Sequence, residues 1–575
     1  MEKLSNDMKG IRLYDIAIFL LYFFTGVIIT TSLFFLLGIS VNVFNVVLPF
    51  IGTAILFYYK KESISSTILI LIISTSLLII LILFSAQSFD KTWDGAAYHK
   101  QAVGLLKEGW NPVYRSAAEY NELSNSIKYP SDNPLKWAES YPKASWYFAS
   151  SIYYLTGNIE SGKAYTLVFM FVLFAFMFEF LTDKKFELWK KILLSFVAAL
   201  NPIAMDQFQT YYVDGLATCV LLLLMLQLLT LYEAKSRGKK IDIQINIFLL
   251  IIIGCNLKFS VLAFTAICCF IYFALYIWVN RNSIKQCINC FVYFALSAIF
   301  SIGIVGFAPY ITNVIRYKNP LYSFTGLIEG SRLEQEFGII GLDRSGRALA
   351  SLFGKMSHGE HNSLKKLLKV PFTFEKNELA YYYYPDVRVS GLGIFFSGIF
   401  IVSLLFITAY VIRHRKKLFK NDFMQFSMAL LFAIAVMIEL LTLEATYQFR
   451  YVGHFYGIAI LALYLLLKTN NLSINKYVNK IAAIAIITIM FINILPWMKI
   501  SYERIQDGIT YQNELESLGG KTDNLTIAFY SYDFSGMHYN LKDYGINSYN
   551  FVDMSQFENQ EYKSIFGNWI MYVEN

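Results

Sequence analysis

The chain has 575 residues, of which 56% are hydrophobic, 17% are aromatic and only 16% are charged. Soluble proteins carry about 25% charged residues, so this composition excludes an ordinary soluble domain and predicts an all-α polytopic membrane protein. The net charge of +8 does not indicate nucleic-acid binding, because membrane proteins collect Lys and Arg in cytoplasmic loops. The six cysteines lie in or beside apolar segments, and their pattern does not predict a metal site.

Long apolar runs recur along the chain and predict about thirteen transmembrane helices. The first run is too long for the core of a signal peptide, so we expect it to be retained. The predicted spans are 13–37, 41–59, 65–86, 160–181, 188–205, 213–232, 245–256, 259–279, 288–307, 391–411, 423–441, 455–468 and 481–497.

Short basic loops, such as those at 60–61 and 413–420, all fall on one side of the predicted membrane. Basic loops stay in the cytoplasm, so we expect a plasma-membrane protein with its N-terminus inside and its C-terminus outside. The predicted organisation is N-terminal spans 1–86, an outer loop 87–159, spans 160–307, a large outer loop 308–390, spans 391–497, and an outer C-terminal α/β domain 498–575.

The first outer loop begins with QSFDKTWDGAAYHKQAVGLLKEGW, in which apolar side chains recur at helical spacing over 98–106. The pattern is typical of an amphipathic helix that lies on a membrane surface. Asp94 precedes this helix and either caps it or accepts a proton from a substrate hydroxyl. Asp90 is the alternative base, and His99 is a candidate substrate ligand.

Further acids and aromatic residues lie close to the predicted outer boundary. Asp206, Tyr212 and Asp214, in NPIAMDQFQTYYVDG, are either ordinary loop residues or a wall that orients a sugar or a divalent cation. Two acids do not specify a metal. Glu139 and Lys143, in WAESYPKASW, form either a charged loop face or the far rim of the same cavity.

Four basic residues at the same boundary are candidates for binding a phosphate group. Lys258 lies between two apolar runs, where it either reaches the interface or holds a phosphate in a cavity. Arg450 and His454, in YQFRYVGHF, stand at the outer start of another span, and Arg316 follows the ninth span. The planar fork of arginine suits phosphate oxygens.

The chain resembles the bacterial GT-C glycosyltransferases, which use polyprenyl-phosphate sugars. The resemblance covers about 85–460 and rests on overall pattern and on short motifs. The matching segments are WDGAAYH at 93–99, GWNP at 109–112, ESYPKASW at 139–146, NPIAMDQFQTYYVDG at 201–215, NLKFS at 256–260 and NPLYSF at 319–324. The resemblance implies that an acid of the first outer loop is the base, here Asp94 or Asp90. In this chain that loop follows the third predicted span rather than the first, and the C-terminal domain matches no module known from the family.

The resemblance further implies transfer of a sugar from a polyprenyl-phosphate donor to a hydroxyl of a glycan, lipid or protein on the outer face. The donor carries its own anionic leaving group, so a base and two or three cations suffice for this chemistry. The sequence has no Gly-rich nucleotide loop, which is consistent with a lipid-carried donor. This chemistry implies no specific cofactor, and the sequence leaves open whether a divalent cation takes part.

Three other functions compete with this interpretation. A ligase or polymerase of the O-antigen type would centre on Arg and His in a large late outer loop, and 308–390 contains Arg332, Arg344, His358 and His361. A lipid or solute transporter would need ionisable groups near the membrane midplane or inverted repeats, and the sequence shows no repeat. A non-catalytic assembly protein is the third alternative.

Overall fold

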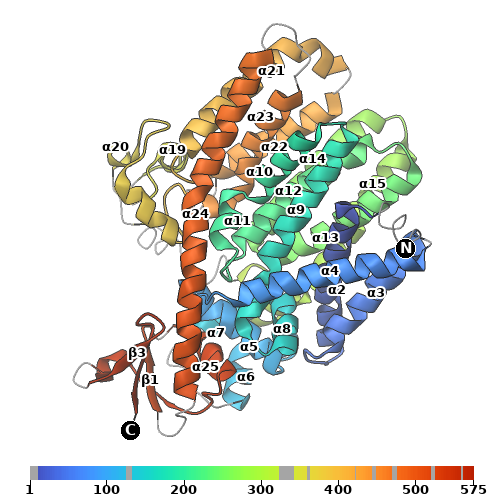
Figure 1. Ribbon diagram of the computed structural model, residues 1–575. Helices are drawn as coiled ribbons and strands as arrows, with labels where there is room; N and C mark the ends of the chain where they lie inside the picture. Colours follow the sequence, from blue (N-terminus) through green and yellow to red (C-terminus); the bar gives the residue numbers. More distant parts are fainter. Residues whose placement is uncertain are drawn as a thin grey trace.

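A computed structural model gives the arrangement of most of the chain (Figure 1). It describes residues 11–61, 63–124, 133–322, 342–358, 363–420, 423–442, 448–468, 476–519, 525–531, 533–557 and 561–574. Helices dominate, and a small sheet lies near the C-terminus.

In the described part of the chain, ten helical segments are long and apolar enough to cross a membrane. The protein is therefore a multi-pass membrane protein, as predicted. These segments are Leu13–Leu36 (α2), Ile64–Ala86 (α4), Ile159–Asp183 (η2 and α9), Asp214–Glu233 (α12), Arg237–Leu257 (α13), Phe259–Asn280 (α14), Ile284–Val305 (α15 and η3), Phe396–Lys416 (in α21), Phe449–Lys468 (η7 and α23) and Ala483–Gly519 (in α24). A shorter apolar helix, Phe426–Thr442, lies in α22.

The structure differs from the predicted set of about thirteen spans at three places, one of which is 423–441, where the shorter helix Phe426–Thr442 lies. The predicted span 41–59 is the helix Phe44–Lys61 (α3), which contains Pro49 and is less apolar than the ten. The predicted span 188–205 is broken into Leu188–Ala199 (α10) and Pro202–Gln207 (α11), because Asn201 caps a new helix whose first residue is proline. A proline at this position is compatible with a helix start but not with a continuous helix.

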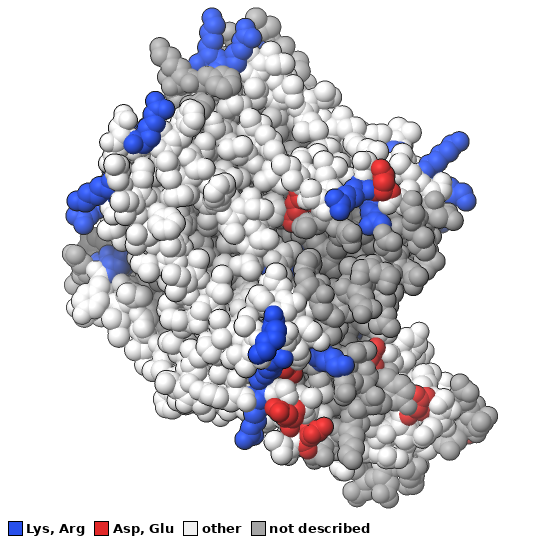
Figure 2. Space-filling view, turned by 180° about the vertical axis from the view of Figure 1, so that it is seen from behind, with Lys and Arg blue, Asp and Glu red and all other residues white. Residues whose placement is uncertain are grey.

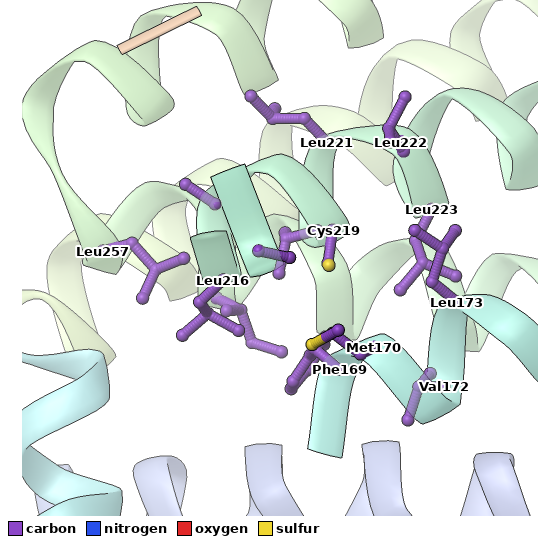
Figure 3. Close-up of a cluster of buried hydrophobic side chains, with 14 of the residues drawn as sticks. Phe169, Met170, Val172, Leu173, Leu216, Cys219, Leu221, Leu222, Leu223 and Leu257 are labelled. Carbon is purple, nitrogen blue, oxygen red and sulfur yellow. The ribbon is translucent and has the colours of Figure 1, made fainter. Parts of the chain in front are cut away.

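The transmembrane helices enclose one continuous apolar core. Helix α12 is buried on nearly all sides because α9, α11, α13, α14 and η7 surround it. Figure 3 shows Leu216, Cys219 and Leu223 of α12 together with Phe169 and Leu173 of α9 in this core. A helix that is apolar all round needs such surroundings, and α12 therefore supplies a rigid support for its polar first residue, Asp214.

Charged side chains are sparse over the middle of the molecule. Figure 2 shows a broad face that is largely free of Lys, Arg, Asp and Glu, with the charged groups gathered toward its edges. Exposed apolar side chains cover the helices α4 and α15, whose spans are only 22% and 17% buried. This distribution is typical of surfaces that face lipid tails.

The predicted α/β character of the C-terminal domain is confirmed. Its strands are Leu525–Phe529 (β1), Asn550–Phe551 (β2), Lys563–Ile565 (β3) and Ile570–Glu574 (β4), in the order β2-β1-β4-β3. Strand β1 runs parallel to β2 and antiparallel to β4. The 44-residue helix α24 (Lys476–Gly519) leads without a break from the membrane to this sheet (Figure 1).

The segment 87–159, predicted to be the first outer loop, forms four α-helices: Lys100–Glu108 (α5), Ala117–Ser124 (α6), Asn133–Ser140 (α7) and Ala144–Thr156 (α8). The expectation that the first of these lies on a membrane surface is wrong, because residues 100–106 of α5 are buried. Helix α8 covers one side of α5, and the C-terminal helix Met537–Asp543 (α25) also packs against it. Lys100 and Glu108 of α5 bind the protein groups Glu160 and Lys542 instead of lipid headgroups.

Candidate functional site

Asp94 lies where the loop after α4 turns into a helix, immediately before one π-helical turn, Gly95–His99 (η1). The Thr92 carbonyl accepts a hydrogen bond from the Ala96 N–H at 2.8 Å, and the Thr92 hydroxyl accepts one from the Gly95 N–H at 3.2 Å. A side chain at Gly95 would collide with the Asp90 carboxylate, since its Cβ would lie 2.0 Å from Oδ2. Single π-helical turns are frequent at functional sites.

The structure separates the two candidate bases by their surroundings. Asp90 is buried, and its two carboxylate oxygens accept hydrogen bonds from the N–H groups of Tyr211 at 2.6 Å and Thr92 at 2.8 Å. The Asp94 side chain makes no capping hydrogen bond and is 28% exposed. Asp90 therefore joins two chain segments, whereas the Asp94 carboxylate can accept a proton from a ligand.

Arg450 faces Asp94 from the start of the η7 segment, Phe449–Tyr456. Its Nη1 lies 3.9 Å from Asp94 Oδ2, too far for a hydrogen bond, and Nη1 has no hydrogen-bond partner in the described structure although it is buried. Its Nε donates to Gln448 at 3.0 Å and its Nη2 donates to the Tyr451 hydroxyl at 2.9 Å. One arm of the guanidinium is thus fixed, and the other is left for an anionic ligand.

Lys258 is the second cation of this site. It adopts an extended backbone that separates α13 from α14. Its Nζ lies 2.6 Å from Asp214 Oδ1 and 3.9 Å from the centre of the Tyr451 ring. Because Arg450 also lies over Tyr451, at 4.8 Å from the ring centre, the two cations share one aromatic ring.

Asp214 is positioned by Gln207, a residue that the sequence analysis did not single out. The Gln207 amide donates to Asp214 Oδ2 at 3.3 Å and to the Pro385 carbonyl at 3.2 Å, and its oxygen accepts from the Gly215 N–H at 2.9 Å. This buried amide connects the Lys258–Asp214 pair to the segment 308–390. Among the described residues, no three His, Cys, Asp or Glu side chains form a group that could hold a metal ion.

Aromatic side chains surround the charged groups. Tyr98 lies in ring contact with Trp137, Tyr141 and Trp146, and Arg450 lies 5.1 Å from the centre of the Tyr212 ring. An arginine between tyrosine rings is held by cation–π attraction and shielded from water. The site therefore combines a few charges with an apolar wall, as binding sites for small organic ligands commonly do.

His99 stays neutral in this wall. Its Nδ1 accepts a hydrogen bond from the Trp146 indole N–H at 2.7 Å, and it is 1% exposed. Burial and the nearby Lys258 and Arg450 lower the pKa of His99 to about 3. A histidine with this pKa can orient a neighbour but does not carry a charge near neutral pH.

Burial and neighbouring charged groups shift the pKa of the Asp94 carboxyl. Burial raises the pKa of Asp94 to about 6, Arg450 acts in the opposite direction, and Asp386 of the segment 308–390 adds to the rise. Such a value is suited to a general base that works near neutral pH. Asp386 was not predicted; the only signal was an acid next to a tyrosine run in YYYYPDVR.

The predicted residues Glu139, Lys143 and Arg316 form a neighbouring cluster. The Glu139 carboxylate accepts hydrogen bonds from Arg316 and from the Tyr317 hydroxyl, both at 2.9 Å. Lys143 is buried and donates to the carbonyls of Glu139 at 2.6 Å and Tyr141 at 2.8 Å. Arg316 is thus satisfied by a protein carboxylate, and Lys143 by the backbone.

Of the remaining predicted residues, Asp206 borders the site, since Arg450 and Asp386 both act electrostatically on it, whereas His454 pairs with a different acid. Asp206 is buried on α11, and its carbonyl accepts a hydrogen bond from Arg504 of α24 at 3.2 Å. His454 lies 3.1 Å from Glu439 of α22, and its ring lies 4.0 Å from that of Phe264. His454 therefore binds an acid inside the helix bundle.

The structure describes two of the four residues that a ligase- or polymerase-like enzyme would use. Arg344 begins the helix Arg344–Phe353 (α19), and His358 stacks on Tyr384 with 4.7 Å between ring centres. Asp386 and Arg450 both act electrostatically on His358, so this histidine borders the site. Arg332 and His361 lie outside the described residues.

No family model matches the sequence, and a search of curated proteins returned no match. Among solved structures, the chain is similar to ArnT from Cupriavidus metallidurans bound to undecaprenyl phosphate, with a TM-score of 0.46 and 11% identity over 87% of this chain and 96% of that chain. It is also similar to ArnT from Cupriavidus metallidurans in the apo state, with a TM-score of 0.41 and 12% identity over 85% of this chain and 86% of that chain.

Proposed function

We propose that this membrane protein transfers a sugar from a polyprenyl-phosphate donor to a hydroxyl of a glycan, lipid or protein acceptor on the outer face of the membrane. The observation that carries the proposal is the pairing of Asp94, which has a raised pKa, with Arg450, whose Nη1 is buried and unbonded in the described structure. A carboxylate and a cation held 3.9 Å apart leave room for a ligand that needs both.

The chemistry requires one base and an anion site. Asp94 accepts the proton of the acceptor hydroxyl while the hydroxyl oxygen bonds to the anomeric carbon of the donor sugar. The bond from that carbon to the phosphate oxygen breaks, and its electron pair stays on the phosphate. Arg450 Nη1 and Lys258 stabilise the charge that develops on the leaving phosphate.

A polyprenyl phosphate suits this arrangement better than a leaving group that must be protonated. The charged groups that act on Asp94 include the cations Arg450 and Lys258, which stand where an anionic leaving group would need them. A phosphate leaves as an anion and needs only positive charge. The segments WDGAAYH and NPIAMDQFQTYYVDG, which resemble the GT-C family, supply Asp94 and Asp214 to this site.

The test is sugar transfer by the purified protein in lipid nanodiscs, with a panel of polyprenyl-phosphate sugars and product detection by mass spectrometry. Asp94→Asn preserves side-chain size and should lower turnover by about 10²- to 10⁴-fold. Asp242→Asn, which changes an exposed acid of the α13 segment, is the matched control. Parental turnover by the Asp94→Asn protein, or no transfer from any donor by the parental protein, would contradict the proposal.

The ligase-like reaction is the second candidate, because His358 borders the site. A ligase would use a donor whose glycan is carried on a polyprenyl diphosphate. Loss of activity in His358→Gln together with full activity in Asp94→Asn would favour that reaction.

A further inference from the structure

The C-terminal domain is docked directly on the turn that follows Asp94. The Gly536 N–H donates to the Ala96 carbonyl at 2.8 Å, and the Ser535 hydroxyl donates to the Ala97 carbonyl at 3.2 Å. Lys100 of α5 donates to the Asn540 side chain of α25 at 2.8 Å. The domain is therefore fixed against the π-helical turn at the proposed active site.

This docking creates a cluster of aromatic rings beside Asp94. Phe534 meets Trp93 edge to face, with 4.9 Å between ring centres and an angle of 74°. Phe534 also stacks on Trp569 at 4.7 Å and 10°, and Tyr530 lies 5.9 Å from Trp569. We call the rings of Trp93, Tyr530 and Trp569, which are supported by the buried Phe534, the aromatic platform.

The platform is open to ligands. Trp93 is 49% exposed and Tyr530 is 60% exposed, whereas the supporting Phe534 is fully buried. The Tyr530 N–H donates to the Trp569 carbonyl at 3.0 Å, which keeps these two residues side by side. Contiguous exposed apolar patches of this kind mark interaction sites on protein surfaces.

We propose that the aromatic platform binds a sugar ring of a glycan acceptor and thereby presents one of its hydroxyls to Asp94. This inference rests on the proposed transfer reaction. The apolar C–H face of a pyranose complements a flat aromatic ring, which offers a large contact area with few freely rotating bonds. Trp93 and Asp94 are consecutive, so their Cα atoms lie about 3.8 Å apart and the platform begins one residue before the base in the chain.

The polar surroundings favour a glycan over a membrane surface. The segments 530–536 and 566–569 contain Ser531, Asp533 and Asn568 but no Lys or Arg, and the neighbouring Lys91 is held by a hydrogen bond to the Tyr511 hydroxyl at 2.5 Å. An anionic membrane surface attracts basic segments, and a segment with one Asp and no base lacks that attraction. Hydroxyl and amide groups, by contrast, can hydrogen-bond to the hydroxyls around a sugar ring.

Binding is measured without turnover, by saturation-transfer NMR and by tryptophan fluorescence with a panel of methyl α- and β-glycosides of glucose, galactose, mannose and N-acetylglucosamine. The parental protein should bind at least one glycoside through its C–H face. Trp93→Ala and Tyr530→Ala should each weaken that binding about tenfold, by analogy with the loss of one stacked ring. Tyr530→Phe keeps the ring and should bind like the parental protein.

The control is Tyr562→Ala, which removes another tyrosine of the same domain that is 46% exposed and lies outside the platform. It should leave glycoside binding unchanged. Equal binding by the parental, Trp93→Ala and Tyr530→Ala proteins would overturn the inference, as would the failure of the parental protein to bind any glycoside of the panel.

Two further outcomes are informative. If vesicles of phosphatidylethanolamine and phosphatidylglycerol, rather than glycosides, change the Trp93-dependent fluorescence, the platform is a membrane contact and the inference is wrong. If glycosides bind the platform but Asp94→Asn transfers sugar at the parental rate, the proposed reaction fails while the sugar site stands.

Discussion

The pH dependence of sugar transfer is a quantitative test of Asp94 as the base. A base must be ionised to accept a proton, and burial raises the pKa of Asp94 to about 6. With this pKa, the Asp94 carboxyl is ionised in about nine-tenths of the molecules at about pH 7 and in about one-tenth at about pH 5. Between these values kcat/KM should fall about tenfold, whereas an unperturbed aspartate with a pKa of about 3.9 would lose less than about a tenth.

The fall of kcat/KM toward low pH is the acid limb of the pH profile. Substitution of two neighbours of Asp94 should move this limb in opposite directions. Asp386 raises the pKa of Asp94, so Asp386→Asn should shift the limb to lower pH. Arg450 lowers it, so Arg450→Gln should shift the limb to higher pH even though overall activity also falls. The assay measures kcat/KM from about pH 4.5 to about pH 8 with one donor and one acceptor, because this parameter reports the ionisation of the free enzyme.

Two results would refute the assignment. A parental profile that stays flat down to about pH 5 would mean that no base with a raised pKa limits the reaction. An acid limb that persists at the same position in the residual activity of Asp94→Asn would belong to another group.

Three other measurements test separate parts of the structure. Arg450→Lys keeps the positive charge but loses the planar fork of the guanidinium, so it should weaken the binding of a short-chain polyprenyl phosphate about tenfold, measured by titration. An unchanged Kd would show that Arg450 does not bind the phosphate. Gly536→Ala would place a Cβ 2.5 Å from the carbonyl of the π-helical turn and should lower kcat with little change in donor Kd, whereas Gly238→Ala, which meets nothing within 4 Å, should not. In a variant without the native cysteines, Ser555→Cys should react with an impermeant thiol reagent from outside and Ser236→Cys should not; the reverse labelling would invert the topology.

The parts of the fold that depend on local pattern could be predicted from the sequence. Apolar runs located most of the spans, and the alternating segments LTIAFY and WIMYVE became β1 and β4. The end of the last span was harder to predict, because α24 continues as a charged helix for about 20 residues beyond its apolar part. A hydropathy criterion detects where a helix stops being apolar, not where it stops being helical.

The parts of the site that depend on distant contacts could not be predicted. Asp94, Lys258 and Arg450 were identified as chemically suitable groups at one boundary, and the structure brings them together. The π-helical turn after Asp94 depends on hydrogen bonds from residues 535–536, more than 400 positions away in the chain. No periodicity within 87–115 records those partners, so the first outer loop resembled a bare amphipathic helix.

A second group of buried charged residues, centred on Glu160, differs from the proposed site because its members are hydrogen-bonded to one another. Glu160, at the start of the α9 span, accepts hydrogen bonds from Lys100 and Asn540 on one oxygen and from Lys163 and the Asp90 N–H on the other. Every member of this network has its partners, as buried charges must if the fold is to be stable.

Arg450 Nη1 is buried like this network but lacks such partners within the described structure, and the Asp94 side chain beside it is 28% exposed. Leaving a buried polar group unbonded costs about 1–3 kcal/mol, which a ligand that bonds to it recovers. The Glu160 network therefore fixes the C-terminal domain on the segment 87–159, and that rigid contact lets the neighbouring Asp94 and Arg450 keep their bonding capacity for a substrate.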